Sequence, residues 1–196
     1  MNKELSYALG VLLGYNLQEQ VEATDMSGDD LIRGLMAALN NQPLEIEASK
    51  AQALVDPYLR QATQRKAFKA LEVEEQFLAE NAKREGVVSR PSGLQYEILV
   101  EGNGRVPRAQ NQVIAHYEGR LLNGKIFDSS FKRGQPAKFP VGGLIQGWQE
   151  ALQLMPVGSK WRLYIPSKLG YGMKGAGSDI PGNATLIFDL ELISIV

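Results

Sequence analysis

The sequence predicts an α+β protein of two parts, an all-α N-terminal part followed by an antiparallel β-sheet with one short helix. Glycine and proline are the first observation, because residues 1–90 hold only five of the 20 Gly and two of the nine Pro. Charge is the second: residues 1–90 carry 10 basic and 14 acidic groups (net −4), and residues 91–196 carry 11 and 8 (net +3). The third is hydrophobic periodicity, which changes from helical spacing to strand alternation between the two parts.

Composition excludes several classes of site. The 196 residues contain no Cys and one His, which excludes disulfides, thiolate zinc sites, a Cys nucleophile and any site that needs two imidazoles. The net charge of −1 provides no field to attract phosphates, so we expect no nucleic-acid partner. The acidic residues show no metal-ligand spacing, so we expect no metal and no cofactor.

The chain is expected to act in the cytoplasm, away from membranes. No run approaches the ~20 apolar residues that a membrane span requires. Residues 8–15 (ALGVLLGY) are similar to the core of a signal peptide, which leaves the periplasm as the alternative. Only Lys3 precedes this stretch, however, and Glu4 offsets its charge.

Residues 4–40 are predicted to form two short amphipathic helices. Leucines at three- and four-residue steps mark the first, and Ser27 is placed to cap the second. Gly10 and Gly14 lie four residues apart, which indicates either close approach by another helix or two tolerated glycines. Two such helices have too little core to be stable alone, and a second copy of the chain is the simplest partner.

Residues 45–85 are rich in Ala, Glu, Gln, Lys and Leu and contain no Gly, which predicts one long helix. Pro57 either kinks this helix or begins its main part. Apolar positions thin out along it, so we interpret it as a solvated stalk, with a coiled coil as the competing interpretation. Glu80 and Arg84 have the spacing of an i,i+4 ion pair, and Gly86 is expected to end the helix.

A linker is predicted at residues 89–93 (SRPSG), where the composition changes. The expected organisation is therefore a helical dimerisation module at residues 1–43, a stalk and linker at 44–88, and a catalytic domain at 89–196.

The C-terminal part is predicted to be a small β domain. Alternating apolar and polar residues predict strands at residues 94–100, 160–165 and 184–196, and further strands are predicted at 113–122 and 125–127, on the two sides of a hairpin. Asn123 and Gly124 are typical of a hairpin turn. Residues 144–154 have helical spacing and supply the single helix of this part.

Two features that suggest other chemistry are set aside. Residues 170–175 (GYGMKG) match the dinucleotide-binding pattern G-x-G-x-x-G, but the Gly- and Pro-containing residues that follow cannot open the helix that this site needs. His116 could act as a general base, but no motif places a nucleophile beside it, so we favour a structural histidine.

A group of aromatic and branched residues recurs where loops and strand ends meet the predicted helix. It is interpreted either as ordinary core or as an apolar ligand pocket, and the placement of Tyr171 in a Gly-rich loop and of Trp148 after Gly147 favours the pocket. One carboxylate, Asp128, directly follows Phe127.

Seven motifs occur in order from residue 113 onward: VIAHYEG, GKIFDSS, LIQGW, MPVGS, IP, YG and IPGNATLIFDLE. With them, residues 90–196 resemble the FKBP-type peptidyl-prolyl cis-trans isomerases, in which an antiparallel sheet wraps around one short helix. The first half is similar in layout to the N-terminal module of the bacterial Mip-like subgroup. That resemblance implies a V-shaped homodimer with two intertwined short helices and a long stalk helix.

The resemblance also implies the site. Catalytic roles fall on Tyr117, Asp128 and Tyr171, where the Tyr117 hydroxyl holds Asp128 and Tyr171 donates to a ligand carbonyl. Trp148 would lie beneath the proline ring, and the backbone N–H of Ile145 would donate to the substrate. The implied substrate-binding residues are Phe127, Phe139, Leu144, Ile145, Trp148, Ile180 and Phe188.

The function implied is isomerisation of X–Pro bonds during protein folding, with unfolded or proline-containing polypeptides as substrates and macrolides of the tacrolimus or rapamycin type as inhibitors. One aromatic of the family falls on Ala137 here, which implies a more open pocket on that side. The alternative is a chaperone-like binding module whose pocket holds proline segments with little catalytic role.

Overall fold

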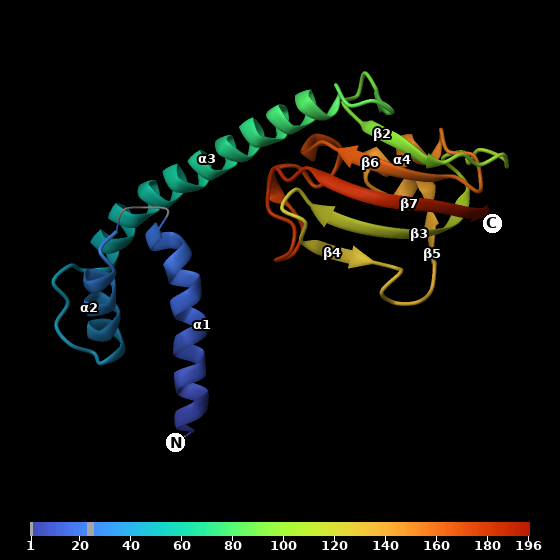
Figure 1. Cartoon of the computed structure of the whole chain (residues 1–196). Helices are drawn as coiled ribbons and strands as arrows, with labels where there is room; N and C mark the ends of the chain where they lie inside the picture. The colour runs from blue at the N-terminus through green and yellow to red at the C-terminus, as the bar shows by residue number, and fades with distance from the viewer. Residues whose placement is uncertain (1, 23–25) are drawn as a thin grey trace. The chain divides into compact units, whose positions relative to one another are not determined.

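The computed structural model describes residues 2–22 and 26–196 (Figure 1). The chain divides into two compact units, Met1–Lys66 and Ala67–Val196. The division falls inside the longest helix, so the last part of that helix belongs to the same unit as the sheet.

The predicted pair of N-terminal helices is present as α1 (Lys3–Glu22) and α2 (Gly28–Leu39). The Ser27 side chain caps α2 by accepting a hydrogen bond from the Asp30 N–H at 3.3 Å, as its position in the sequence indicates. No residue of α2 is buried. Among the described helices, none combines the length and apolarity needed to cross a bilayer.

The long helix α3 (Ala48–Asn81) runs through Pro57 without interruption. Pro57 therefore does not begin the helix, and the interpretation that it does is wrong. The helix also ends at Asn81 rather than at Gly86. Glu80 pairs with Lys83 at 2.6 Å and not with Arg84, whose guanidinium is bonded to Asn81, Tyr164 and Glu97 instead.

Within residues 26–196, seven strands form one sheet in the order β1-β2-β6-β7-β3-β4, with β5 paired to β3 (Figure 1). Every pairing is antiparallel, as the sequence predicts. The strands are β1 (Val87–Ser89), β2 (Gln95–Val100), β3 (Gln112–Leu121), β4 (Ile126–Ser129), β5 (Ala137–Pro140), β6 (Lys160–Ile165) and β7 (Leu186–Ile195).

Two strands were not expected from the sequence. β1 pairs with β2 from Val87 opposite Glu97 to Ser89 opposite Gln95, so the sheet begins before the predicted linker at 89–93. β5 pairs with β3, although a proline precedes it at position 136 and another ends it at position 140. Both strands are too short to show an alternating pattern, which explains why periodicity does not reveal them.

The core of this unit lies between the inner face of the sheet and the helix α4 (Gln146–Leu152). Alternate residues of β3 are buried, and the same holds along most of β7. From α4, Trp148, Ala151 and Leu152 join the core. Gly147 allows this approach, because a Cβ there would lie 2.5 Å from the Ile165 side chain.

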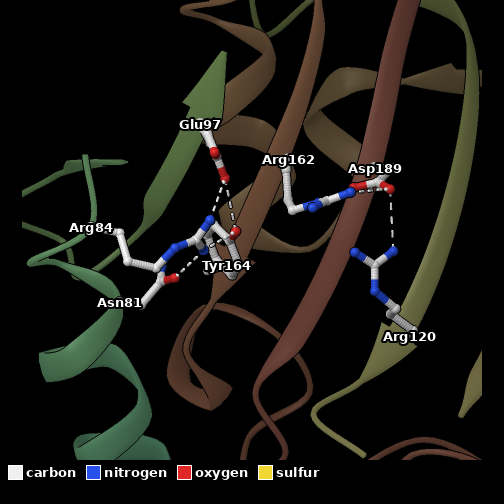
Figure 2. A network of polar contacts seen from close by, with 7 residues as sticks. All are labelled: Asn81, Arg84, Glu97, Arg120, Arg162, Tyr164 and Asp189. Atoms are coloured by element: carbon white, nitrogen blue, oxygen red, sulfur yellow. Dashed lines mark hydrogen bonds and ion pairs between the residues drawn. The ribbon is translucent and has the colours of Figure 1, made fainter. Parts of the chain in front are cut away.

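The outer face of the sheet carries a charge ladder across β6, β7 and β3 (Figure 2). Asp189 accepts from Arg162 at 2.6 and 2.9 Å and from Arg120 at 3.2 Å. Burial alone would raise the pKa of Asp189, but the hydrogen bonds from the two arginines outweigh it and hold the pKa below the ordinary value.

Candidate active site

A cavity of about 460 Å³ opens at the N-terminal end of α4. It lies between the inner face of the sheet and the loop that connects β6 to β7. All ten side chains singled out from the sequence line it: Tyr117, Phe127, Asp128, Phe139, Leu144, Ile145, Trp148, Tyr171, Ile180 and Phe188. Gly143, Ala176 and Asp179 complete the lining.

Trp148 is the centre of the apolar wall and is only 3% exposed. Three aromatic rings stand edge-on to its indole, with centroid separations of 5.3 Å to Tyr117, 5.6 Å to Phe139 and 5.2 Å to Phe188. The interplanar angles lie between 79° and 86°, the geometry that aromatic quadrupoles favour. The four rings therefore form one continuous aromatic wall of the cavity.

Strand register brings this wall together around a glycine. Gly119 of β3 lies opposite Asp128 of β4 and Phe188 of β7. The rings of Phe127 and Phe188 occupy the space above it and meet edge to face at 5.5 Å. A Cβ on Gly119 would lie 2.5 Å from the Phe188 ring and 2.6 Å from the Phe127 ring, so a side chain there would displace both.

The polar side of the cavity is a three-residue network. The Tyr117 hydroxyl donates to Asp128 Oδ2 at 2.5 Å. Arg133 Nη2 donates to the Tyr117 oxygen at 2.8 Å, and Arg133 Nη1 donates to Asp128 Oδ1. Both carboxylate oxygens of Asp128 therefore have a partner within the protein.

This network sets the charge states of its members. Burial alone would raise the pKa of Asp128, but hydrogen bonds from Tyr117 and Arg133 hold it below the ordinary value. Burial, together with the hydrogen bond to Asp128, raises the pKa of the Tyr117 hydroxyl. Asp128 is thus an anion and Tyr117 a neutral donor across the physiological range.

The loop between β6 and β7 supplies the other side of the cavity through Tyr171, Ala176, Asp179 and Ile180. Ala176 and Ile180 form a bridge with N···O distances of 2.9 and 3.1 Å. Asp179 also pairs with Lys125 at 2.8 Å, which ties the loop to the β3–β4 turn. Tyr171 is 41% exposed, so its ring remains open to a ligand.

The backbone at the start of α4 offers a donor. Leu144 ends a short 3-10 turn (Val141–Gly143), and Ile145 caps α4. Over residues 2–22 and 26–196, no protein group accepts from the Ile145 N–H. The amide is therefore available to a ligand in the cavity.

Arg133 and Asp179 are two site residues that sequence reasoning missed. Arg133 lies in the loop between β4 and β5, five positions beyond Asp128, and its guanidinium reaches back to the Asp128 carboxylate. Asp179 lies in the Gly-rich loop without a motif of its own. A charged residue shortly after the Phe127–Asp128 pair is the one signal that indicates Arg133.

The two features set aside from the sequence lie outside this chemistry. His116 bonds Ser130 Oγ at 2.9 Å through Nδ1 and stacks on Phe131, and it does not line the cavity. The G-x-G-x-x-G segment contains a short 3-10 turn (Gly172–Lys174), and no α-helix follows it before β7.

Comparisons with known protein families match both parts of the chain. Residues 103–193 match the family described as FKBP-type peptidyl-prolyl cis-trans isomerase. Residues 2–98 match the family described as the domain amino terminal to FKBP-type peptidyl-prolyl isomerase. The two matches together span nearly the whole sequence.

Individual proteins are similar over the same length. The FKBP-type 22 kDa peptidyl-prolyl cis-trans isomerase of Escherichia coli is 42% identical over 196 residues, which cover 98% of this chain and 95% of that protein. The outer membrane protein MIP of Legionella longbeachae is 35% identical over 199 residues, covering 98% and 84%. The crystal structure of FkpA from E. coli superposes with a TM-score of 0.72 at 29% identity, covering 99% and 96%.

Proposed function

The chain belongs to the FKBP-type peptidyl-prolyl cis-trans isomerases and is an enzyme of that activity, and from this premise we propose how its own residues perform the reaction. The cavity around Trp148 receives the proline of an X–Pro segment. The observation that carries the proposal is the edge-on packing of three rings against Trp148, because it forms a rigid apolar surface of the kind a proline ring fits.

The chemistry needs no nucleophile, metal or acid–base pair, since no bond to nitrogen breaks. Rotation about the X–Pro amide is opposed by a barrier of ~18–20 kcal/mol because the planar form has partial double-bond character. The twisted transition state loses that resonance, and its carbonyl is less polar. An aromatic cavity disfavours the polar planar form and favours the twisted one, which is differential binding of the transition state.

Polar groups at the rim hold the peptide in register. We assign Tyr171 and the Ile145 backbone N–H as donors to substrate carbonyls, on opposite sides of the proline. Asp128 acts through Tyr117, because both of its oxygens are already engaged by Tyr117 and Arg133. Its proposed role is to fix the Tyr117 ring, which packs directly against Trp148.

A protease-coupled assay on short X–Pro peptides tests this function. We expect Asp128→Ala to lower kcat/KM about tenfold, the size of one lost hydrogen bond to a charged group. Asp189→Asn is the matched control, because it removes an arginine-paired carboxylate on the outer face of the sheet. No acceleration by the wild-type chain would leave the alternative, a module that binds proline segments without catalysing their isomerisation.

We further propose that the chain acts as a homodimer formed by residues 1–43, with residues 44–88 as stalk and 89–196 as the catalytic domain. The apolar side chains of α1 and α2 are largely uncovered in the single chain, for example Leu12 at 62% and Ile32 at 59% exposed. A Cβ added to Gly10 or Gly14 would meet no atom within 4 Å, which leaves room for a second helix.

Light scattering tests the dimer. We expect twice the chain mass for the wild type, a monomer for Leu12→Glu, and a dimer for the control Lys3→Glu, which changes charge without altering an apolar position. A dimer offers two cavities to one unfolded chain, so the same variants separate chaperone-like binding from catalysis. Leu12→Glu should keep peptide activity but lose most of its ability to suppress aggregation of an unfolded protein.

Macrolides of the tacrolimus or rapamycin type are proposed to occupy the same cavity. Ala137 leaves one side without the aromatic ring of other family members, so we expect Ala137→Phe to tighten inhibitor binding. Competition between inhibitor and peptide in the isomerase assay measures this.

For the cell compartment we propose the cytoplasm, because the apolar stretch at residues 8–15 lies inside α1 and within the part that matches the family's N-terminal domain. The similarity to a protein named as an outer membrane protein makes the cell envelope the alternative. Fractionation of spheroplasts, followed by immunoblotting, distinguishes the two.

A further inference from the structure

Glu74 of α3 is a carboxylate buried against the catalytic unit. The residue is only 8% exposed. Glu74 Oε2 accepts from the Ser167 N–H at 2.6 Å and from Thr185 Oγ1 at 2.9 Å, and Oε1 accepts from Ser167 Oγ at 3.1 Å. Ser167 and Thr185 are themselves 4% and 2% exposed.

Helix packing alone does not explain an acid at this position. Burial of a carboxylate is costly unless hydrogen bonds satisfy it, and an apolar residue would cover the same surface without that cost. Here the three donors are uncharged, and all three come from the two ends of one chain segment. This part of α3 is therefore solvated on most of its surface but not on the side of Glu74 and Asn81, which are buried.

Residues 167–185, here called the pocket loop, carry Tyr171, Ala176, Asp179 and Ile180 to the cavity. The loop leaves the sheet after β6 and rejoins it at β7. One carboxylate therefore holds the first residue of the loop and the last at the same time.

A second contact from α3 reaches the same loop. Asn183 Nδ2 donates to the Ala67 carbonyl at 3.1 Å, and the Asn183 N–H donates to the Gly172 carbonyl at 2.8 Å. Asn183 adopts a left-handed φ of 58°, a conformation that asparagine tolerates better than most residues. The loop is thus bonded to α3 near its end and folded back on itself.

The C-terminal end of α3 is held differently (Figure 2). Arg84, just beyond the helix, donates to the Tyr164 hydroxyl at 2.8 Å and pairs with Glu97 at 3.3 Å. Asn81 donates to Gln95 at 2.8 Å. Their partners lie on β2 and β6, outside the pocket loop, so they dock the helix without touching the cavity.

We propose that Glu74 is a positioning residue for the cavity: it closes the pocket loop from α3 and so keeps Tyr171 and Ile180 in place for substrate. This inference rests on the proposed function. Pairing of β6 with β7 brings the two ends of the loop together as far as Ile165 opposite Leu186. Glu74 fixes the residues just beyond that pair, Ser167 and Thr185, and so removes conformations in which the base of the loop separates from α3. Without Glu74, a smaller fraction of the molecules has the pocket loop in the binding-competent conformation, and the measured affinity for substrate falls in proportion. If that fraction falls to about one tenth, KM rises about tenfold while kcat stays nearly unchanged.

The test uses the full-length chain with Glu74→Ala, Glu74→Gln and the matched control Asn81→Ala. We expect Glu74→Ala to raise KM about tenfold and to speed amide exchange in residues 170–182, but not in β3 or β7. Glu74→Gln should recover most of the affinity, because its amide can accept from Ser167 N–H and donate to Ser167 Oγ. Asn81→Ala should lower thermal stability while leaving KM and loop exchange unchanged.

Thr185→Val is a second, isosteric variant, for the case that Glu74→Ala does not fold. It removes one hydrogen-bond donor to Glu74 and leaves the carboxylate in place. It should raise KM about two- to threefold. The inference is overturned if loop exchange and KM stay at wild-type values in Glu74→Ala or Thr185→Val, or if Asn81→Ala raises KM equally. A wild-type chain without isomerase activity would refute the proposed function instead, and the exchange measurement would still decide the role of Glu74.

Discussion

Gly119→Ala should distort the cavity from beneath. The new Cβ would lie 2.5 Å from Phe188 and 2.6 Å from Phe127, measured to the nearest ring carbons. Non-bonded carbons rest about 3.5–4.0 Å apart, so each ring must retreat by about 1 Å. Gly119 is buried on a strand inside the sheet, and both rings line the cavity, so the displaced rings can move only toward the cavity.

The magnitude follows from that overlap. Overpacking of a well-filled core costs about 1–3 kcal/mol. At about 4 °C per kcal/mol for a unit of this size, the melting temperature should fall by about 4–12 °C. Both displaced rings line the cavity, and a misplacement of about 1 Å can cost up to about a hundredfold in rate, so we expect kcat/KM to fall at least tenfold.

Thermal unfolding by circular dichroism and the peptide assay together measure the effect. The double variant Gly119→Ala/Phe127→Leu gives the new methyl group room, so it should recover stability, but it should not recover activity because the aromatic wall is incomplete. Wild-type stability and wild-type kcat/KM in Gly119→Ala would refute the argument that ring packing over Gly119 shapes the cavity.

Three further outcomes are expected. The kcat/KM should stay constant from about pH 6 to 9, because the pKa of Asp128 is lowered and that of Tyr117 is raised, so neither group titrates in this range. A sigmoidal step inside this range would contradict the assignment of Asp128 as an anion and Tyr117 as a neutral donor. The pKa of Asp189 is also lowered by folding. Its contribution to the free energy of unfolding is therefore complete above the unfolded pKa near ~4 and is lost as the pH falls through the folded pKa. Denaturant unfolding of Asp189→Asn should accordingly show a weaker loss of stability below about pH 5 than the wild type shows. A fragment of residues 67–196 should keep the wild-type KM on short peptides, whereas a fragment of residues 91–196 should have a raised KM. The same KM for both fragments would show that the end of α3 does not act on the cavity.

The part of the site that sequence reasoning could predict is the part carried by motifs. Phe127 and Asp128 are adjacent in the chain, and Tyr117 follows an alternating strand pattern, so their neighbourhood is encoded locally. Trp148 and Phe188 lie far apart in sequence; the distribution of aromatic residues left ordinary core and a ligand pocket open for them, and the family resemblance assigned both to the pocket. Their edge-on contact depends on the register of β7 and on the approach of α4, which periodicity does not specify.

The residues that were missed act through tertiary contacts of long polar side chains. Glu74 stands in a helix rich in charges, where an acid that will be buried has the same sequence surroundings as one that will be solvated. Arg133 depends on the direction of a turn. The strands β1 and β5 were missed for a simpler reason, since three or four residues are too few to establish an alternation.

The edge strands of the sheet limit how an unfolded polypeptide can pair with this protein. Its terminal strands are short, three residues in β1 and four in β4, whereas the ten-residue strands β3 and β7 lie inside the sheet. An exposed strand edge is a template on which an extended polypeptide can add a further strand, and short edges restrict that reaction. An extended client chain therefore finds little free backbone to pair with at either edge, so the sheet that carries the cavity offers a poor template for co-aggregation with a substrate.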